Sequence, residues 1–525
     1  MTTERIYLST TIPYVNARPH LGHALELVQA DVLARHHRLA GDQVRFQTGT
    51  DDNSLKNVLA AEAEGVPVAE LVSRYADAFA GLREPLALSF DDFIRTSSDP
   101  RHRPGVERLW AACADRGDLY LKHYEGRYCV GCEQFYKPAE LRDGRCPEHL
   151  TQPQLVAEEN WFFRLSRYAG QLRDLVGSGR LRIEPAARRN EVLGFIAGGL
   201  EDFSVSRSTA RARGWGIPVP GDPGQVIYVW WDALGNYITA LGYGTDAGDY
   251  RRWWAGADRR VHLVGKGVLR FHAVYWPAIL LSAGEPLPTD VLVHDYLTAG
   301  GRKISKSGPG GASADPSRAH LDRADPVALA ARYGSDAVRW WLLREVPRLG
   351  DADFTAERLV ARANDDLAND LGNLVSRTVT LVHRYRQGKV PRAAHAESAR
   401  PAPAGRALAG LRDQAPQRIA AALAAFDFRA ATAALWAVVE AANRYVEQTQ
   451  PWRLARAERD GDLACGERLD ESLALLVETC SQLGGDLAPF LPGLAARIQA
   501  ACDDSAGELP PARPVFPRLE LAQTA

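Results

Sequence analysis

The chain has 525 residues, of which 46% are hydrophobic and 24% charged, and its formal net charge at pH 7 is −2. This length predicts two to four domains, and the composition is typical of a soluble globular protein. The balanced charge excludes a polycation that holds nucleic acid by bulk charge, although a local basic face remains compatible with it.

The first fifty residues predict a strand, a helix and a second strand. RIYLSTTIPY has the pattern of a buried strand that runs into a loop, and QVRFQTGTDD has the alternation of another strand. Between them, HLGHALELVQADVLARHHRLAG places Leu25, Val28 and Val32 on one helical face, and Pro19 suits the first turn of that helix. Such a βαβ unit binds its ligand at the carboxyl ends of the strands, beside the helix N-terminus.

The motif HLGH, residues 20–23, lies at that helix N-terminus. A helix begins with unpaired N–H groups and a partial positive charge, which together attract anions. His20 and His23 share a helical face, so both imidazoles can donate hydrogen bonds to phosphate oxygens. Gly22 between them lets a flat ring approach the backbone. The motif indicates a phosphate site, although it is a weak signal by itself.

A cysteine-bearing segment follows at about residues 116–215. It contains two ligand pairs, Cys-x2-Cys and Cys-x2-His, thirteen residues apart. This spacing suits a tetrahedral Zn²⁺ held by thiolates and an imidazole, and four protein ligands leave no open position for water. The alternative, four unrelated buried residues, is the weaker interpretation. We therefore predict a structural zinc site whose ligands are Cys129, Cys132, Cys146 and His149.

Strand and helix signals resume in QVIYVWWDALGNYITAL and RRVHLVGKGVLRFHAVYWPAILL. The motif KISKS follows at residues 303–307, flanked by glycines. Lys303 and Lys306 on a mobile loop suit a leaving pyrophosphate, whose charge grows in the transition state. Alone, KISKS is more simply a solvated turn, but its pairing with HLGH on a βαβ unit favours the functional interpretation. From about residue 351 the chain predicts helices without further strands.

These features resemble the methionyl-tRNA synthetase family of class I aminoacyl-tRNA synthetases. The resemblance covers residues 6–455, in the family's order. That family activates methionine with ATP, releases pyrophosphate, and moves the acyl group to the terminal ribose of its tRNA. The stretches that carry the resemblance are TIPYVNARPHLGH, TGTDD, YCVGCEQFY…CPEH, EENWFFRLSRY, DFSVSR, WGIPVPGDPGQVIYVWWDALGNYITALGY, GKGVLRFHAVYWPAILL, KISKS and NDLANDLGNLVSR.

The resemblance implies an α/β Rossmann-type catalytic domain with a parallel sheet, a zinc-binding insertion and an all-α C-terminal bundle similar to an anticodon-binding domain. Combined with the patterns above, it divides the chain into five parts. The expected ranges are 1–115 and 216–310 for the two halves of the catalytic domain, 116–215 for the insertion, 311–350 for a connecting region and 351–525 for the helical domain.

The resemblance also implies roles for single residues, with ATP and Mg²⁺ as substrate. Aromatic walls with a tyrosine or histidine donor suit a thioether. Taken alone, the aromatic stripe on the predicted helix is more simply core, and Asp51 could equally be a turn residue. The implied ATP-binding residues are Asn16, His20, Gly22, His23, Lys303 and Lys306, of which the histidines and lysines are catalytic. The implied amino-acid-binding residues are Ile12, Tyr14, Asp51, Trp230, Ala233, Tyr237 and His272.

Three residues of the helical region match the family's anticodon-reading set. Asn373 and Arg377 are neighbours at i and i+4, and Trp452 follows in QTQPWRLA. Planar donors and a stacking ring suit unstacked single-stranded bases, so the resemblance implies tRNA binding here. The alternatives are a buried capping role for Asn373 and a place in the core for Trp452.

The sequence departs from the family pattern at several loops. The family's Thr-Asp-Glu-His-Gly-Gln-Lys reads TDDNSLK at residues 50–56, and Gly267 replaces an acid beside the pocket. Gly235 stands where a larger aliphatic residue is common, and Asp295 follows His294 where the family has glycine. After KISKS, the expected Leu-Gly-Asn is missing.

Two functions are therefore compatible with the sequence. The first is methionine–tRNA ligation. The second is a tRNA-independent ligase of specialised metabolism that passes methionine or another amino acid to a small-molecule hydroxyl or hydroxylamine, as in hydrazine-forming pathways. A catalytically inactive RNA-binding protein is a weaker third, since both histidines and both lysines are present.

The sequence also predicts where the protein works. MTTERIYLST lacks the apolar core of a signal peptide, and the apolar stretch 271–284 contains a histidine and a proline and is too short to cross a bilayer. Seven cysteines in a chain of this length argue against a disulfide framework. We expect a cytoplasmic monomer with no membrane partner.

Overall fold

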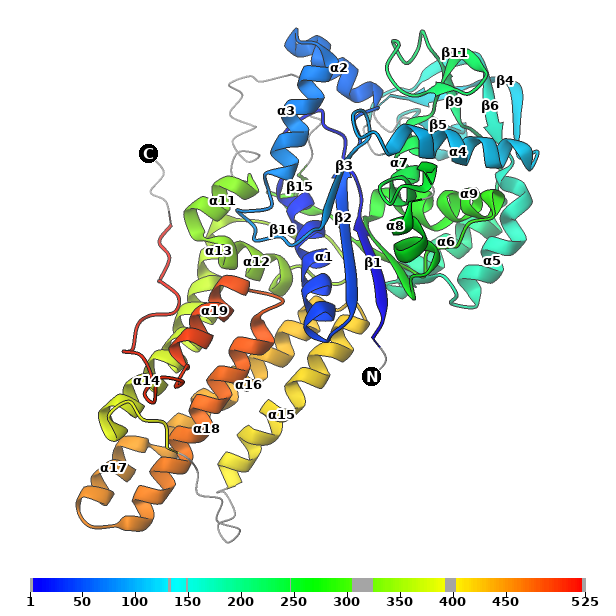
Figure 1. Cartoon of the computed structure of the whole chain (residues 1–525). Coiled ribbons are helices and arrows are strands. Elements are labelled where there is room, and N and C mark those ends of the chain that lie inside the picture. Colours follow the sequence, from blue (N-terminus) through cyan, green and yellow to red (C-terminus); the bar gives the residue numbers. More distant parts are fainter. Residues whose placement is uncertain are drawn as a thin grey trace.

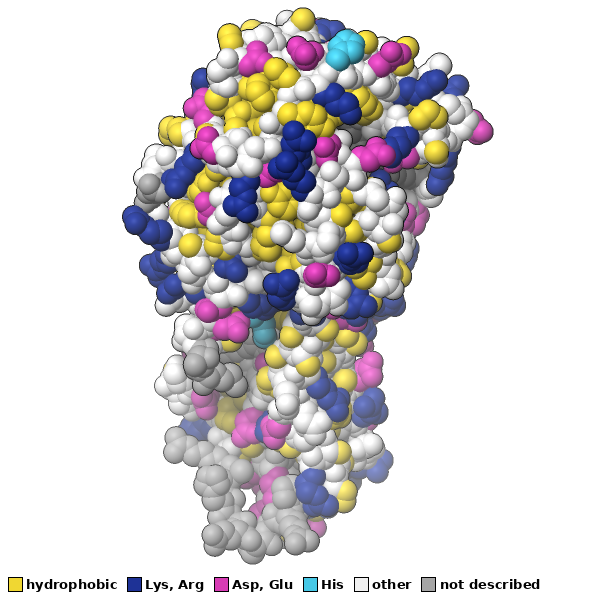
Figure 2. Space-filling view, turned by 90° about the vertical axis from the view of Figure 1, so that its right-hand side faces the viewer, with side chains coloured by type: hydrophobic (Ala, Val, Ile, Leu, Met, Phe, Trp, Pro, Cys, Tyr) yellow, Lys and Arg dark blue, Asp and Glu magenta, His cyan; other side chains and the backbone are white. Residues whose placement is uncertain are grey.

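A computed structural model describes residues 3–130, 134–147, 150–245, 247–304, 324–391 and 403–521. The molecule consists of a broad α/β part and a long helical part that extends away from it (Figure 1). In the face drawn in Figure 2, Lys and Arg side chains lie scattered among Asp and Glu over both parts. Across the described residues, no helix is long and apolar enough to span a membrane.

A six-stranded sheet organises the α/β part, and all of its neighbouring strands are parallel. The predicted Rossmann-type fold with a parallel sheet is thus confirmed. Strand order reverses between β1 and β12, and a ligand is expected beside such a switch point. The strands, in order across the sheet, are β3 (Asp92–Arg95), β2 (Gln43–Thr50), β1 (Arg5–Thr10), β12 (Arg259–Gly265), β13 (Asp290–His294) and β7 (Arg182–Glu184).

Two hydrophobic cores cover the two faces of this sheet. Because side chains of a strand alternate between faces, Ile6 and Leu8 of β1 join one core while Tyr7 joins the other. The first core contains α1 (Leu21–Leu39) and α12 (Ser335–Arg344). The second contains α4 (His102–Asp115), α7 (Val229–Thr239) and α9 (Trp276–Ala283), which Figure 1 shows on the opposite side of β1 from α1.

Helix α1 begins one residue later than the sequence suggested. His20 is its N-cap, with extended backbone angles of φ −126° and ψ 172°, and its side chain accepts a hydrogen bond from the backbone N–H of Gly22. Pro19 therefore precedes the cap instead of occupying the first turn.

The segment 116–215 is less uniform than the predicted insertion. It does form an antiparallel sheet of β5 (Gln134–Tyr136), β4 (Leu119–Cys129), β6 (Gln154–Phe163) and β8 (Phe203–Ser204). However, α5 (Ala169–Gly177), β7 and α6 (Ala186–Ala197) belong with the main sheet, where β7 pairs with β13. Only Ile183 of β7 is apolar, so no strand pattern marked it. Near the end of the segment, β9 (Ser206–Ser208) pairs with β11 (Asp222–Ile227), which also pairs with β10 (Pro218–Val219), so this small sheet extends beyond residue 215.

Most of the described residues between 351 and 502 are helical, and residues 503–521 contain neither helix nor strand. β16 (Ala352–Asp353) pairs with β14 (Leu297–Ala299), which also pairs with β15 (Arg302–Lys303), so a short sheet leads into the KISKS region. α11 (Pro326–Tyr333) precedes α12. The helices that follow are α13 (Ala356–Arg362), η8 (Ala363–Gly372), α14 (Asn373–Arg386), α15 (Pro403–Ala424), α16 (Phe428–Thr449), α17 (Pro451–Arg459), α18 (Leu463–Leu487) and α19 (Pro492–Ala501).

A buried guanidinium joins the two parts. Arg339 of α12 pairs with Asp31 of α1 at 2.8 Å, and both side chains are fully buried. It also donates to the backbone carbonyls of Leu86 (3.0 Å), Pro489 (3.0 Å) and Phe490 (2.7 Å). Burial alone would raise the pKa of Asp31, but Arg339 and then Arg35 hold it below its ordinary value.

Replacing Arg339 by leucine should destabilise the protein. The change removes the main partner of a buried carboxylate and leaves three carbonyls without their donor, although Asp31 keeps Arg35. We expect a loss of about 3 to 5 kcal/mol, measured by urea denaturation. The exposed pair of Arg74 and Glu64 provides the control, because Arg74→Leu should leave the midpoint near that of the parent chain. Equal urea midpoints for the two variants would contradict the stabilising role of Arg339.

Candidate active site

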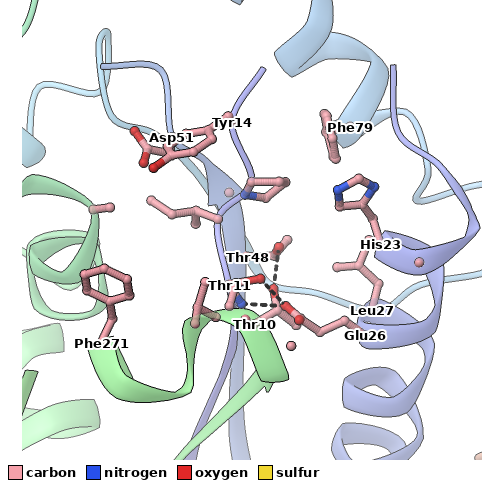
Figure 3. Close-up of a pocket in the computed structure, with 18 of the residues that line it drawn as sticks. Thr10, Thr11, Tyr14, His23, Glu26, Leu27, Thr48, Asp51, Phe79 and Phe271 are labelled. Atoms are coloured by element: carbon pink, nitrogen blue, oxygen red, sulfur yellow. Dashed lines mark hydrogen bonds between the residues drawn. The ribbon is translucent and has the colours of Figure 1, made fainter. Parts of the chain in front are cut away.

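A cavity of about 360 Å³ lies at the carboxyl ends of β1, β2, β12 and β13. Its size is within the usual range for small-molecule sites. Figure 3 shows Asp51, Tyr14 and Phe271 on one side of it, His23 and Phe79 on the other, and Thr10, Thr11 and Glu26 between them. The cavity is therefore at the switch point of the sheet.

Most of the predicted small-molecule site residues line this cavity. Lys306 is outside the described residues, and of Lys303 only its place in β15 is described. The predicted residues in the lining are Ile12, Tyr14, Asn16, His20, Gly22, His23, Asp51, Trp230, Ala233, Tyr237 and His272.

The two histidines of HLGH form a reciprocal cap. His20 Nδ1 accepts from the backbone N–H of Gly22 at 3.1 Å, and His23 Nδ1 accepts from the backbone N–H of His20 at 3.1 Å. A backbone N–H only donates, so both Nδ1 atoms are unprotonated and the ring protons are on Nε2. The ring centroids are 3.8 Å apart, and His23 packs edge-on against Phe79. The helix end thus presents two oriented imidazole N–H donors.

Gly22 is needed for a reason more specific than the sequence suggested. The ring that approaches its backbone is the imidazole of His20, because a Cβ at Gly22 would lie 2.9 Å from His20 Cε1 and 3.0 Å from Nδ1. Any larger residue would have to displace the capping ring.

Asp51 is held at the end of β2 by backbone contacts. Its N–H donates to the carbonyl of Pro13 at 3.0 Å, and it forms a parallel bridge with Tyr14. The side chain is 2% exposed, and its Oδ1 accepts from the backbone N–H of Asn53 at 3.3 Å. A buried carboxylate on a cavity wall favours a cationic ligand group.

Aromatic rings form the wall next to Asp51. Trp230 at the start of α7 stacks on Phe271, with centroids 3.9 Å apart and planes 6° apart, and Tyr14 meets Trp230 edge-on. Ala233, one turn further along α7, leaves room in front of these rings. This part of the cavity suits a slender apolar group.

Tyr237 and His272 form a hydrogen bond with each other. His272 Nδ1 lies 2.9 Å from the carbonyl of Val268, which only accepts, so Nδ1 carries the proton. The Tyr237 hydroxyl then donates to His272 Nε2 at 2.7 Å. Burial lowers the pKa of His272 to about 4, which keeps the ring neutral. In this arrangement both protons are used within the protein, whereas the sequence predicted a tyrosine or histidine donor for a thioether.

The floor of the cavity contains a pair that the sequence analysis missed. Glu26 accepts from the N–H and the hydroxyl of Thr11 at 2.6 and 2.5 Å, and its other oxygen lies 2.8 Å from His294 Nε2. Burial lowers the pKa of His294, but Glu26 raises it above its ordinary value. The signal in the sequence that could have identified Glu26 is its position three residues, about one helical turn, after His23.

Two departures from the family pattern have structural explanations. A Cβ at Gly267 would overlap the hydroxyl of Tyr296, so Tyr296 occupies the space beside the cavity that an acid would need. Gly235 does not line the cavity. It faces α4, where its Cβ would lie 3.4 Å from Val106 Cγ2 and 3.9 Å from Leu109 Cδ2. A methyl group there would make ordinary van der Waals contacts with α4, away from the cavity.

The cysteine segment is only partly described. Cys129 and Cys146 lie in one small buried cluster with Tyr136, and the Cys146 thiol is 3.6 Å from the Tyr136 hydroxyl. Cys132 and His149 fall outside the described residues. Within the described ranges, no group of three or more His, Cys, Asp or Glu side chains is arranged to hold a metal. Tyr136 also lines the cavity, so this cluster supports its wall.

The three residues matched to anticodon reading are exposed and lie in the helical part. Asn373 begins α14, and Arg377 on the same helix pairs with Glu447 at 2.8 Å. Trp452 on α17 is 40% exposed, and Figure 1 shows α17 at the tip far from the sheet. The alternatives of a buried capping Asn373 and a core Trp452 are therefore wrong.

Comparisons with known proteins agree on one family. The model described as "tRNA synthetases class I (M)" matches residues 6–154 and 136–379. The methionine–tRNA ligase of Brucella suis is 40% identical over 541 residues, covering 99% of the chain and 98% of that protein. That of Caldanaerobacter subterraneus is 40% identical over 493 residues, covering 94% and 73%.

Solved structures give the same result. Mycobacterium tuberculosis methionyl-tRNA synthetase bound by methionyl-adenylate superposes with a TM-score of 0.88 at 37% identity, covering 98% of the chain and 100% of that structure. Its apo form gives a TM-score of 0.83 at 36% identity, covering 99% of each.

Replacing Gly22 by alanine should weaken nucleotide binding, because the new Cβ displaces the His20 ring. We expect roughly tenfold weaker binding of a non-hydrolysable ATP analogue, the loss of about one hydrogen bond to a charged group, measured by calorimetry. Gly194→Ala on α6 is the matched control, since its Cβ would meet no atom within 4 Å. Unchanged binding by Gly22→Ala would contradict the role of the ring.

Proposed function

The chain belongs to the methionyl-tRNA synthetase family of class I aminoacyl-tRNA synthetases, and we propose from this how its residues share the reaction. It is a methionine–tRNA ligase type of enzyme, which forms an aminoacyl-adenylate from methionine and ATP, releases pyrophosphate and transfers the acyl group to tRNA. The observation that carries our proposal is that a buried carboxylate and a histidine-capped helix N-terminus face each other across one cavity.

We propose that the ATP phosphates lie at the N-terminus of α1. The Nε2–H groups of His20 and His23 donate to phosphate oxygens, Gly22 keeps the rings in place, and Asn16 lies beside them in the cavity wall. ATP brings its Mg²⁺ as counterion. Lys303 and Lys306 then stabilise the departing pyrophosphate. That last role rests on the KISKS motif.

Methionine occupies the other side of the cavity in this proposal. Asp51 receives the ammonium group, and the thioether chain lies along Ile12, Tyr14, Trp230 and Ala233. A carboxylate oxygen of methionine attacks the α-phosphorus of ATP, and the bond to pyrophosphate breaks as the new P–O bond forms. No enzyme group becomes covalently attached, so positioning and charge stabilisation supply the catalysis.

Tyr237 and His272 contribute shape and neutrality instead of a hydrogen bond to sulfur. Their mutual hydrogen bond and the contact of His272 with Val268 fix both rings. A neutral His272 adds no positive charge to the cavity that receives the substrate ammonium.

We propose that tRNA contacts the tip of the helical part through Asn373, Arg377 and Trp452. An exposed indole can stack on an unpaired base, and the amide and guanidinium groups can donate to base edges. The comparisons do not favour the tRNA-independent ligase, because the similar proteins are methionine–tRNA ligases over nearly their full length. The Tyr296 hydroxyl fills the space beside Gly267, and Gly235 faces α4 instead of the cavity. These two departures from the family pattern are therefore poor evidence for another substrate.

Labelled methionine should be transferred to bulk tRNA in an ATP-dependent reaction. Trp452→Ala should lower charging at limiting tRNA by about tenfold or more, the loss of one stacked base, while leaving methionine-dependent ATP–pyrophosphate exchange unchanged. Leu463→Ala, which removes another exposed apolar side chain in the helical part, is the control. AMP release without charged tRNA would instead point to a small-molecule acceptor.

We further propose that Cys129, Cys132, Cys146 and His149 bind a structural zinc ion. Two thiols in one small cluster fit half of a tetrahedral site. Purified protein should contain one zinc ion per chain, and Cys146→Ser should lose zinc and melt at lower temperature because metal binding contributes to folding. Cys113→Ser, at a buried cysteine on α4, should keep its zinc. A metal-free wild type with the same melting temperature would overturn the site.

A further inference from the structure

Asn53 connects two separate elements of the methionine pocket. Its backbone N–H donates to Asp51 Oδ1 at 3.3 Å, and its side-chain Nδ2 donates to Asp232 Oδ2 at 2.7 Å. Nδ2 also lies 3.4 Å from the carbonyl of Thr96. Asp51 belongs to the loop after β2, whereas Asp232 belongs to α7, which carries Trp230 and Ala233. One residue therefore bonds to both walls.

Asp232 is itself held in place by a buried histidine of α4, His102. Its Oδ1 contacts His102 Nε2, and His102 Nδ1 lies 2.7 Å from the hydroxyl of Thr239. That hydroxyl donates to the carbonyl of Asn236, so it accepts the Nδ1 proton of His102. Asp232 is 1% exposed, and His102 and Thr239 are fully buried. The position of Asp232, and hence of the Asn53 amide, is set by the packing of α4 on α7.

We propose that Asn53 is a positioning residue that orients the Asp51 carboxylate toward the ammonium group of the substrate and fixes it relative to the side-chain pocket on α7. The inference rests on the proposed function, in which Asp51 receives that ammonium. It adds that recognition of the amino group depends on a buried network of Asn53, Asp232 and His102, none of which lines the cavity.

The chemistry of an amide explains why this position suits asparagine. Asn53 lies between two buried carboxylates. Its backbone N–H donates to Asp51, and its uncharged side-chain amide donates to Asp232. A cation at this position would compete with the substrate ammonium for Asp51. A third carboxylate would repel both neighbours and remove the donor to Asp232. The family pattern has a histidine here, so the chain has replaced a titratable donor with a neutral one.

The test exchanges the two groups of the Asn53–Asp232 contact. Asn53→Asp keeps the shape but loses the donor, and we expect the KM for methionine in ATP–pyrophosphate exchange to rise at least tenfold. The KM for ATP should change less than twofold, because the phosphates bind at α1. The double variant Asn53→Asp/Asp232→Asn restores a donor opposite an acceptor and should recover part of the loss.

A substrate analogue without the amino group separates ammonium recognition from general damage. The carboxylic acid that keeps the thioether chain but lacks the α-amine should inhibit the wild type and Asn53→Asp equally, whereas methionine should bind only the wild type well. Asn443→Asp, which removes an amide bonded to the carbonyl of Asp370 in the helical part, is the matched control and should leave both KM values unchanged.

The outcomes are distinct. If Asn53→Asp does not fold, Asn53→Ala, which removes the donor to Asp232 without adding a charge, takes its place in the same assays with the same expected rise in the KM for methionine. Unchanged KM for methionine, or equal increases in both KM values, would overturn the positioning role. Absence of methionine-dependent exchange in the wild type would instead overturn the proposed function and leave the network as a structural feature only.

Discussion

The arrangement of the molecule depends on the burial of one ion pair, Arg339 with Asp31. A buried charge is tolerated only when its partners are complete, and here the guanidinium satisfies a carboxylate and three backbone carbonyls. Asp31 is on the same helix as His20, His23 and Glu26. The helix that presents its N-terminus to the cavity is therefore fixed in position by contacts with the helical part of the chain.

The buried acids in and around the cavity show the same principle at smaller scale, because each of them accepts hydrogen bonds from specific donors. Glu26 is bonded by Thr11 and His294, and Asp232 by Asn53 and His102. Burial raises the pKa of Asp52, whose carboxylate accepts from Ser97. Glu26 and Asp51 both line the cavity, but Glu26 is paired with His294 while Asp51 lies on the side opposite His23, so Asp51 is the carboxylate suited to a charged substrate group.

Much of this could be predicted from the sequence, because periodicity and paired motifs are local signals. The βαβ unit, the parallel sheet and the family followed from HLGH, KISKS and the stretches around them. The place of β7 could not, since a three-residue strand with a single apolar side chain has no pattern. Nor could the orientation of Gly235, which depends on how α4 packs on α7. The hydrogen bond of Tyr237 to His272 was also inaccessible, because it depends on which nitrogen the Val268 carbonyl engages.

The contacts of Arg339 have a consequence for the order in which the chain can mature during synthesis. Domains generally begin to fold as they leave the ribosome, N-terminal parts first. Asp31 emerges early, but its buried counterion is about 300 residues downstream, and the carbonyls of Pro489 and Phe490 come about 150 residues later still. The nascent nucleotide-binding half must therefore keep an incompletely paired carboxylate hydrated until Arg339 is made, and the guanidinium lacks two of its carbonyl acceptors until translation is nearly finished. The hydrogen bonds of the buried Arg339 are therefore complete only when the helical part has been made.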